Sequence, residues 1–167
     1  MAYITALLLA DGPEGLKELA ELFDVDADLM AATLAGDARD DWPPAEIAAA
    51  DAALASIERY IDQAAGEINA RLAVRGYPLP QSAAQFPVLV VWARAITRYH
   101  LHRQRDRTSE DTGRHERDYR DALRALEAVA AGTLSLGAGD PMAAQPAGVG
   151  RITSQPRVFS RDSLRGL

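Results

Sequence analysis

The chain changes character near Leu136, and this change limits what it can fold into. Before that point apolar residues recur at helical spacing. After it come about thirty residues rich in glycine, proline and alanine, with neither helical nor strand periodicity. Such a segment cannot bury a core of its own, so we expect it to be disordered in isolation and to order on a partner surface. The sequence therefore predicts a folded body over residues 1–136 and a long extended C-terminal arm over residues 137–167.

The body is expected to be all-α. Alanine supplies much of the 48% hydrophobic content and aromatic residues only 6%, which favours closely packed helices over sandwiches or barrels. Proline and glycine mark where helices begin and end, and Asp11 is expected to cap the first of them. The predicted helices span about residues 13–23, 28–34, 44–74, 87–105 and 108–131. Three are long, and together they predict a small helical bundle of about four helices.

Each long helix has an apolar stripe that should face the core. In the longest helix the stripe is Leu54, Ile57, Ile61, Ala64, Ile68 and Leu72. In the next it is Val88, Trp92, Ile96 and Tyr99, widened by Val90, Val91 and Leu101. That width predicts that this helix is central to the bundle. In the last helix the stripe is Tyr119, Leu123, Leu126 and Ala130.

The net charge of −6 is unevenly distributed along the chain. Residues 1–60 carry thirteen Asp and Glu against three Lys and Arg, whereas residues 141–167 carry one against four. The whole chain is too acidic to attract nucleic acid generally. An acidic front half and a basic tail indicate head-to-tail contacts between copies, or a tail that docks on an acidic partner. The ordinary alternative is that the acids form a solvated face.

The sequence predicts no catalytic, cofactor-binding or metal-binding residues. The absence of cysteine excludes disulfides and thiolate metal sites. Residues 24–28 resemble the start of a calcium loop, but Leu29 and Ala35 stand where that loop needs glycine and glutamate, so helix capping explains these aspartates better. No serine lies in a nucleophile-elbow motif. We therefore expect a protein that is not an enzyme.

The histidines are His100, His102 and His115. Residues two apart on a helix point in different directions, so His100 and His102 should not share a metal ion. Histidines at the surface or at an interface are expected instead. The chain has neither a run of eighteen apolar residues nor a signal-peptide pattern, which predicts a soluble protein made in the cytoplasm.

Five arginines make the end of one predicted helix basic. They are Arg94, Arg98, Arg103, Arg105 and Arg107. They are candidates for contact with an acidic neighbouring subunit or with nucleic acid. The ordinary alternative, which we favour for most of them, is pairing with Glu110, Asp111 and Asp118 on the next helix.

The arm has a pattern that suits docking on a partner. Its apolar anchors are Val158, Phe159, Leu164 and Leu167. Its arginines recur every four residues, at Arg157, Arg161 and Arg165. Buried aromatic and arginine side chains often supply most of the binding energy of an interface, so these residues are the candidate docking contacts.

Five segments in order resemble the family of Mu-like phage neck proteins. They are MAYIT, IDQAAGEINARLAVRGYPLP, ARAITRYHLH, RDYRDALRALEAVAAGTLSLG and RVFSRDSLRGL. That family is similar to the head–tail connector, or adaptor, proteins that complete the heads of tailed phages and prophages. Residues 22–44 match no part of the resemblance and are interpreted as an insertion of open role.

The resemblance implies a helical subunit in the virion neck, made in the bacterial host. Such subunits form a ring, commonly of about twelve copies, below the portal protein. The ring completes the DNA-filled head, offers the surface for a tail-side neck or tail-terminator protein, and forms part of the DNA channel without sequence-specific binding or membrane contact. C-terminal arms in similar adaptors reach onto the portal or neighbouring subunits.

For this chain the resemblance implies that the arm docks on the portal and that the basic helix end meets an acidic neighbour. Asp37, Asp40 and Asp41 are hypothesised to line the channel, where like charge would keep DNA from sticking. Two alternatives remain. One is a nucleic-acid-binding helical module that uses residues 94–107. The other is a small enzyme or regulatory subunit, which would need polar residues converging in an apolar cleft.

Overall fold

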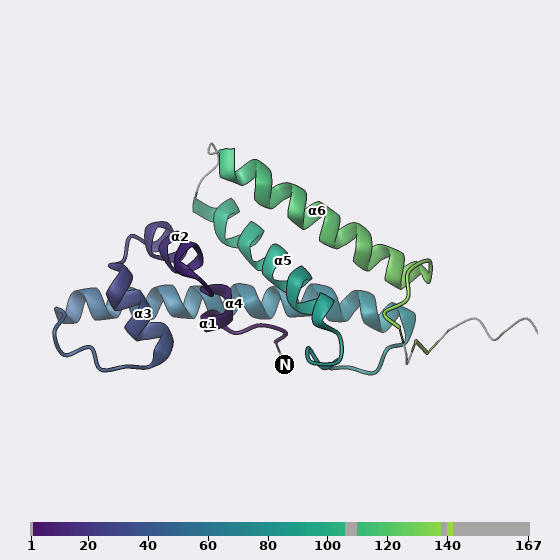
Figure 1. Ribbon diagram of the computed structural model, residues 1–167, viewed down its shortest axis with the longest axis horizontal. Coiled ribbons are helices and arrows are strands. Elements are labelled where there is room, and N and C mark those ends of the chain that lie inside the picture. The colour runs from purple at the N-terminus through teal and green to yellow at the C-terminus, as the bar shows by residue number, and fades with distance from the viewer. Residues whose placement is uncertain (1, 106–109, 138–139, 142–167) are drawn as a thin grey trace, which may run out of the picture.

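The computed structural model describes residues 2–105, 110–137 and 140–141. This part of the chain contains six α-helices and no strand, which confirms the predicted all-α class (Figure 1). The helices are α1 (Ala6–Leu9), α2 (Pro13–Phe23), α3 (Ala27–Ala35), α4 (Pro44–Arg75), α5 (Pro87–Arg105) and α6 (Glu110–Ala131). None of them is both long enough and apolar enough to cross a membrane.

The 32-residue helix α4 is the longest helix, and the other helices pack against it (Figure 1). It begins at Pro44, whose fixed φ suits a first helical position, and ends at Gly76, which has a left-handed φ of 88°. Helices α5 and α6 run antiparallel to each other and lie over the C-terminal half of α4 (Figure 1). Helices α2 and α3 lie near the N-terminal half of α4. The body is therefore a helical bundle built on one long helix.

The main core lies where α4, α5 and α6 meet. Its fully buried side chains include Ile57, Ile68, Leu72, Leu89, Ile96, Leu126 and Val129. A smaller cluster of Ala20, Met30 and Ala53 joins α2, α3 and α4. Most of the stripe predicted for α4 is buried, although Leu54 is only half-buried.

The predicted apolar face of α5 is partly wrong. Trp92, Ile96 and Leu101 are buried as expected, but Val88 and Val91 are 37% and 64% exposed. Leu89 lies in the core instead. The reason is that valines and leucine fill every position from 88 to 91, so the sequence offers no polar residue to mark the solvent side. In α6 the buried seam is Ala122, Leu126 and Val129, while Tyr119, Leu123 and Ala130 are half-buried.

The N-terminal segment contains a short helix that was not predicted. Helix α1 is a single turn capped by Thr5, whose Oγ1 accepts a hydrogen bond from the Leu8 N–H at 3.2 Å. One turn is too short to show a helical periodicity, and all four residues of α1 are apolar, so the sequence does not indicate a helix there. The predicted cap at Asp11 is wrong, because α2 is preceded by Gly12 at φ 82° with no side-chain cap.

Candidate functional site

Two of the five candidate arginines form hydrogen bonds within the chain. Arg94 donates from Nη2 to the carbonyl of Leu8 at 3.1 Å, and Arg98 donates from Nη2 to the carbonyl of Leu9 at 3.5 Å. These carbonyls belong to the last residues of α1, where helical partners are missing. Both arginines therefore cap α1 from α5. Arg103 is exposed, whereas the side chain of Arg105 and all of Arg107 lie outside the described residues.

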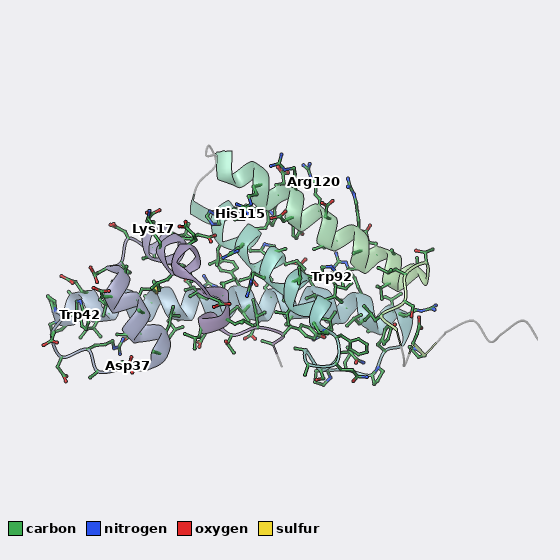
Figure 2. All side chains as sticks on the ribbon, in the orientation of Figure 1. Lys17, Asp37, Trp42, Trp92, His115 and Arg120 are labelled. Atoms are coloured by element: carbon green, nitrogen blue, oxygen red, sulfur yellow. The ribbon has the colours of Figure 1, made fainter. Side chains whose placement is uncertain are left out.

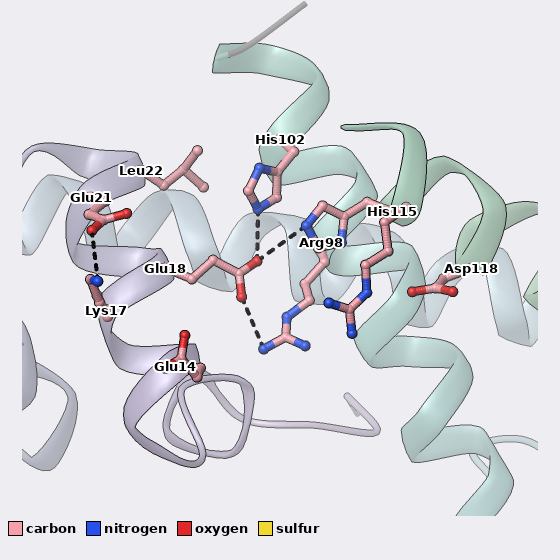
Figure 3. A pocket seen from close by; sticks show the side chains of 10 residues that line it. Glu14, Lys17, Glu18, Glu21, Leu22, Arg98, His102, His115 and Asp118 are labelled. Atoms are coloured by element: carbon pink, nitrogen blue, oxygen red, sulfur yellow. Dashed lines mark hydrogen bonds and ion pairs between the residues drawn. The ribbon is translucent and has the colours of Figure 1, made fainter. Parts of the chain in front are cut away.

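Arg98 also takes part in a polar cluster that the sequence analysis missed. Its Nη2 atom lies 3.1 Å from Oε2 of Glu18, an acid of α2 rather than of the following helix as expected. The other oxygen of the same carboxylate, Oε1, lies 2.7 Å from Nε2 of His102 and 3.7 Å from Nε2 of His115 (Figure 3). We call these four residues the Glu18 cluster.

Three helices bring the Glu18 cluster together. Arg98 and His102 are four residues apart on one face of α5, His115 comes from α6, and Glu18 reaches them from α2 (Figure 3). The rings of His102 and His115 stack with centroids 4.2 Å apart and planes 23° apart. Both histidine side chains are only 13% exposed. These two histidines are therefore largely covered within the chain and do not lie on an open surface, while the predicted interface role stays a prediction.

Burial and charge set the protonation of the cluster. Burial pushes the pKa of Glu18 upward, but the hydrogen bond from His102 and the charges of Arg98 and both histidines outweigh it, so the pKa is lowered. Burial, together with the charge of His102, lowers the pKa of His115 despite the opposing pull of Glu18. These directions favour an ionised Glu18 and a neutral His115 near neutral pH.

The Glu18 cluster opens into a pocket of about 490 Å³ between α2, α5 and α6. The other lining residues are Glu14, Lys17, Glu21, Leu22, Arg114 and Asp118. Apart from Leu22 these side chains are charged, so this is a polar pocket and not the apolar cleft that typifies small-molecule sites. Two imidazoles and one carboxylate that converge there can hold a cation or exchange protons.

The pKa directions predict that the free energy of unfolding decreases as the pH is lowered. Because the folded pKa of His115 lies below its ordinary 6.5, the unfolded chain takes up this proton first as the pH drops, and stability is lost below about pH 6.5. The lowered pKa of Glu18 acts in the same direction below its ordinary 4.5. His115→Gln should flatten the fall in urea midpoint between about pH 7 and pH 5.5.

The exposed Arg120→Gln on the same helix is the control for this series, because the Arg120 side chain is 59% exposed. It should leave the pH dependence unchanged. An equal slope in His115→Gln and the parent chain would show that His115 does not titrate in this way.

The three candidate channel acids lie where the sequence places them. Asp37, Asp40 and Asp41 are exposed in the loop between α3 and α4, at one end of the molecule where Figure 2 labels Asp37 and Trp42. Their exposure agrees with the alternative that these acids form a solvated face. A role in lining a channel stays a prediction.

The seven predicted docking residues of the arm, from Arg157 to Leu167, lie outside the described residues. The structure does describe a contact close to the arm's start. Arg75, the last residue of α4, binds Asp140 in a bidentate pair, with Nε–Oδ1 at 3.1 Å and Nη2–Oδ2 at 3.3 Å. The Asp140 side chain is only 2% exposed. Gly132 at φ 77° lies against the Arg75 guanidinium, where a Cβ would clash.

Removing this ion pair should loosen the start of the arm. Arg75→Ala takes the guanidinium from the buried Asp140 carboxylate, at a cost of about 1–3 kcal/mol in the free energy of unfolding. The loss is limited because residues 133–141 can detach and let water reach the carboxylate. Faster hydrogen exchange over those residues would reveal the detachment. Arg124→Ala, which removes an exposed pair with Asp121, should cost less than about 0.5 kcal/mol. Equal exchange in both variants would contradict the role of Arg75.

Comparison with known proteins identifies the family. A family model described as bacteriophage Mu, Gp36 matches residues 17–154, a range that begins within α2, includes α3 to α6 and enters the arm. Residues 22–44, interpreted above as an insertion, lie inside this matched range. No curated protein and no solved structure matches the chain significantly. Since the match covers most of the sequence, this helical protein belongs to the bacteriophage Mu Gp36 family.

Proposed function

We propose that the chain is a head–tail connector subunit of a Mu-like phage or prophage, assembling as a ring below the portal and offering the joining surface for the tail. The observation that carries this proposal is the family match over residues 17–154, because it joins the helical body and the first part of the arm in one phage protein family. The ring, the portal and the tail-side partner belong to the proposal and rest on the resemblance to adaptor proteins.

The surface of the body supports contacts between copies. Val88 and Val91 lie about one turn apart on the exposed side of α5, and Val91 borders a groove of about 420 Å³ between α5 and α6. A closed ring needs two different surfaces on each subunit, and the chain offers an acidic front half and a basic arm. Head-to-tail pairing of these two regions is consistent with such a ring.

The nucleic-acid-binding alternative is weakened at two of its five arginines. Arg94 and Arg98 are occupied by the carbonyls of α1, and Arg98 also by Glu18. The pairing with Glu18 already neutralises Arg98, which lowers its value as a phosphate contact. The enzyme alternative required polar residues in an apolar cleft, and the Glu18 cluster lies in a polar pocket. The role that we propose is structural.

Deleting the gene from its phage or prophage tests the proposed role. We expect heads that package DNA but carry no tails, together with free tails, because the joining surface is missing. A plasmid copy of the full chain should restore joined particles. Normal virions without the protein, or heads that never package DNA, would contradict a connector role.

A further inference from the structure

We propose that the Glu18 cluster is a binding site for one divalent transition-metal ion, with Zn²⁺ as the expected ion and with Glu18, His102 and His115 as its three protein ligands. The proposal stands on the geometry of these side chains and does not depend on the connector role. It departs from the sequence-based expectation that the chain holds no metal.

The ligand atoms already converge. One carboxylate oxygen of Glu18 and one ring nitrogen from each histidine all lie within 4.8 Å of one another. The Nε2 atoms of both histidines face the same oxygen, at 2.7 Å and 3.7 Å (Figure 3). In a tetrahedral Zn²⁺ site with bonds of about 2.0–2.2 Å, neighbouring ligand atoms lie about 3.3 Å apart. The carboxylate would therefore move slightly away from His102 and toward His115 to admit the ion.

The ligand types fit Zn²⁺. Two imidazole nitrogens and one carboxylate oxygen form a known three-ligand zinc set, in which a fourth position stays open to water. Imidazole favours zinc and its transition-metal neighbours over Mg²⁺ and Ca²⁺, which prefer oxygen ligands. The polar pocket of about 490 Å³ beside the cluster gives the ion a route of entry and leaves space for that water. Asp118 also lines this pocket.

Arg98 supports the site without occupying it. Its guanidinium pairs with Oε2 of Glu18, whereas the two histidines face Oε1. An outer hydrogen bond of this kind fixes the orientation of a ligating carboxylate. Because the ligands come from α2, α5 and α6, a bound ion would also tie the N-terminal helices to the α5–α6 pair.

His100 offers a matched control on the same helix. Its Nε2 atom lies 2.7 Å from Oε1 of Glu67, and its side chain is 10% exposed, so it resembles His102 in partner and burial. It is not among the residues that converge on Glu18. Substituting His100 therefore removes a half-buried histidine–carboxylate pair while leaving the proposed ligands intact.

Calorimetric titration of ZnCl₂ into the tag-free, chelator-stripped full chain tests the site. We expect one ion per chain. His102→Gln and His115→Gln should each raise the Kd at least about 10–100-fold, because losing a residue that only hydrogen-bonds to a metal ligand already has an effect of that size. His100→Gln should bind as the parent chain does. Zn²⁺ should raise the melting temperature of the parent and of His100→Gln, and not that of the two ligand variants.

Circular dichroism of the metal-free variants separates ligand loss from misfolding, and the visible absorption of Co²⁺ reports coordination directly. The tetrahedral Co²⁺ bands should appear with the parent chain and with His100→Gln. Absence of stoichiometric Zn²⁺ binding would overturn the proposal. Binding that survives in folded His102→Gln and His115→Gln, or that is lost equally in His100→Gln, would also overturn it.

Discussion

Ile96→Ala should lower the free energy of unfolding by about 2–5 kcal/mol, the largest stability effect that we expect from a single substitution. Ile96 is completely buried in the main core, on the helix that packs against both α4 and α6. Truncation removes apolar contacts and leaves a cavity, because long helices on either side cannot move inward independently. Urea denaturation followed by circular dichroism measures the change.

Val91→Ala is the matched control, on the same helix and also a loss of apolar atoms. Val91 is 64% exposed, so its truncation should change the free energy of unfolding by no more than about 0.5 kcal/mol. Both variants should be measured at a concentration where the chain is monomeric. Equal losses in the two variants would mean that α5 presents a different face to the core.

Deleting residues 151–167 should abolish binding to the portal while leaving the helical body folded. This is the largest functional effect that we expect. The deleted segment contains the candidate docking residues, while α1 to α6 and the Arg75–Asp140 pair all precede it. Far-ultraviolet circular dichroism and the urea midpoint should therefore stay close to those of the full chain, while pull-down on the cognate portal ring should fall to background.

A chain with residues 151–167 in scrambled order is the control, because it keeps the length, composition and charge of the arm. It should also fail to bind if Phe159, Leu164 and the arginines contact the portal at defined positions. Binding by the scrambled arm would show that charge alone attracts the portal. Unchanged binding by the deleted chain would remove the arm from the docking surface.

Helix ends are the part of the fold that the sequence predicts best. The prediction of 13–23 agrees with α2 at both ends, and that of 44–74 differs from α4 by one residue. The reason is local chemistry, since Pro44 suits a first position and Gly36 and Gly76 adopt the left-handed conformation that ends a helix. Such signals act within a few residues and do not depend on tertiary packing.

Faces are predictable only where polar residues interrupt apolar ones. In α4 charged residues occupy positions between the apolar ones and so indicate which side of the helix faces solvent. Ile57, Ile61 and Ile68 are buried as predicted. In α5 the run from Val88 to Val91 has no such contrast, so the choice of Leu89 for the core depends on where α4 and α6 lie. This information is absent from a single helix.

The Glu18 cluster was not predictable for a similar reason. His102 and His115 meet because α5 and α6 run antiparallel, and Glu18 meets them because α2 packs beside that pair (Figure 3). The only local signal was the four-residue spacing of Arg98 and His102 on one face of α5. A site assembled from three helices leaves no contiguous motif in the sequence.

The mass of the purified full chain, alone and then mixed with its cognate portal ring, tests the connector role most directly. We predict that the chain becomes a stoichiometric ring on the portal, with about twelve copies in the complex, the number that the resemblance to adaptor proteins implies. A chain that stays monomeric and leaves the mass of the portal ring unchanged would contradict the connector role.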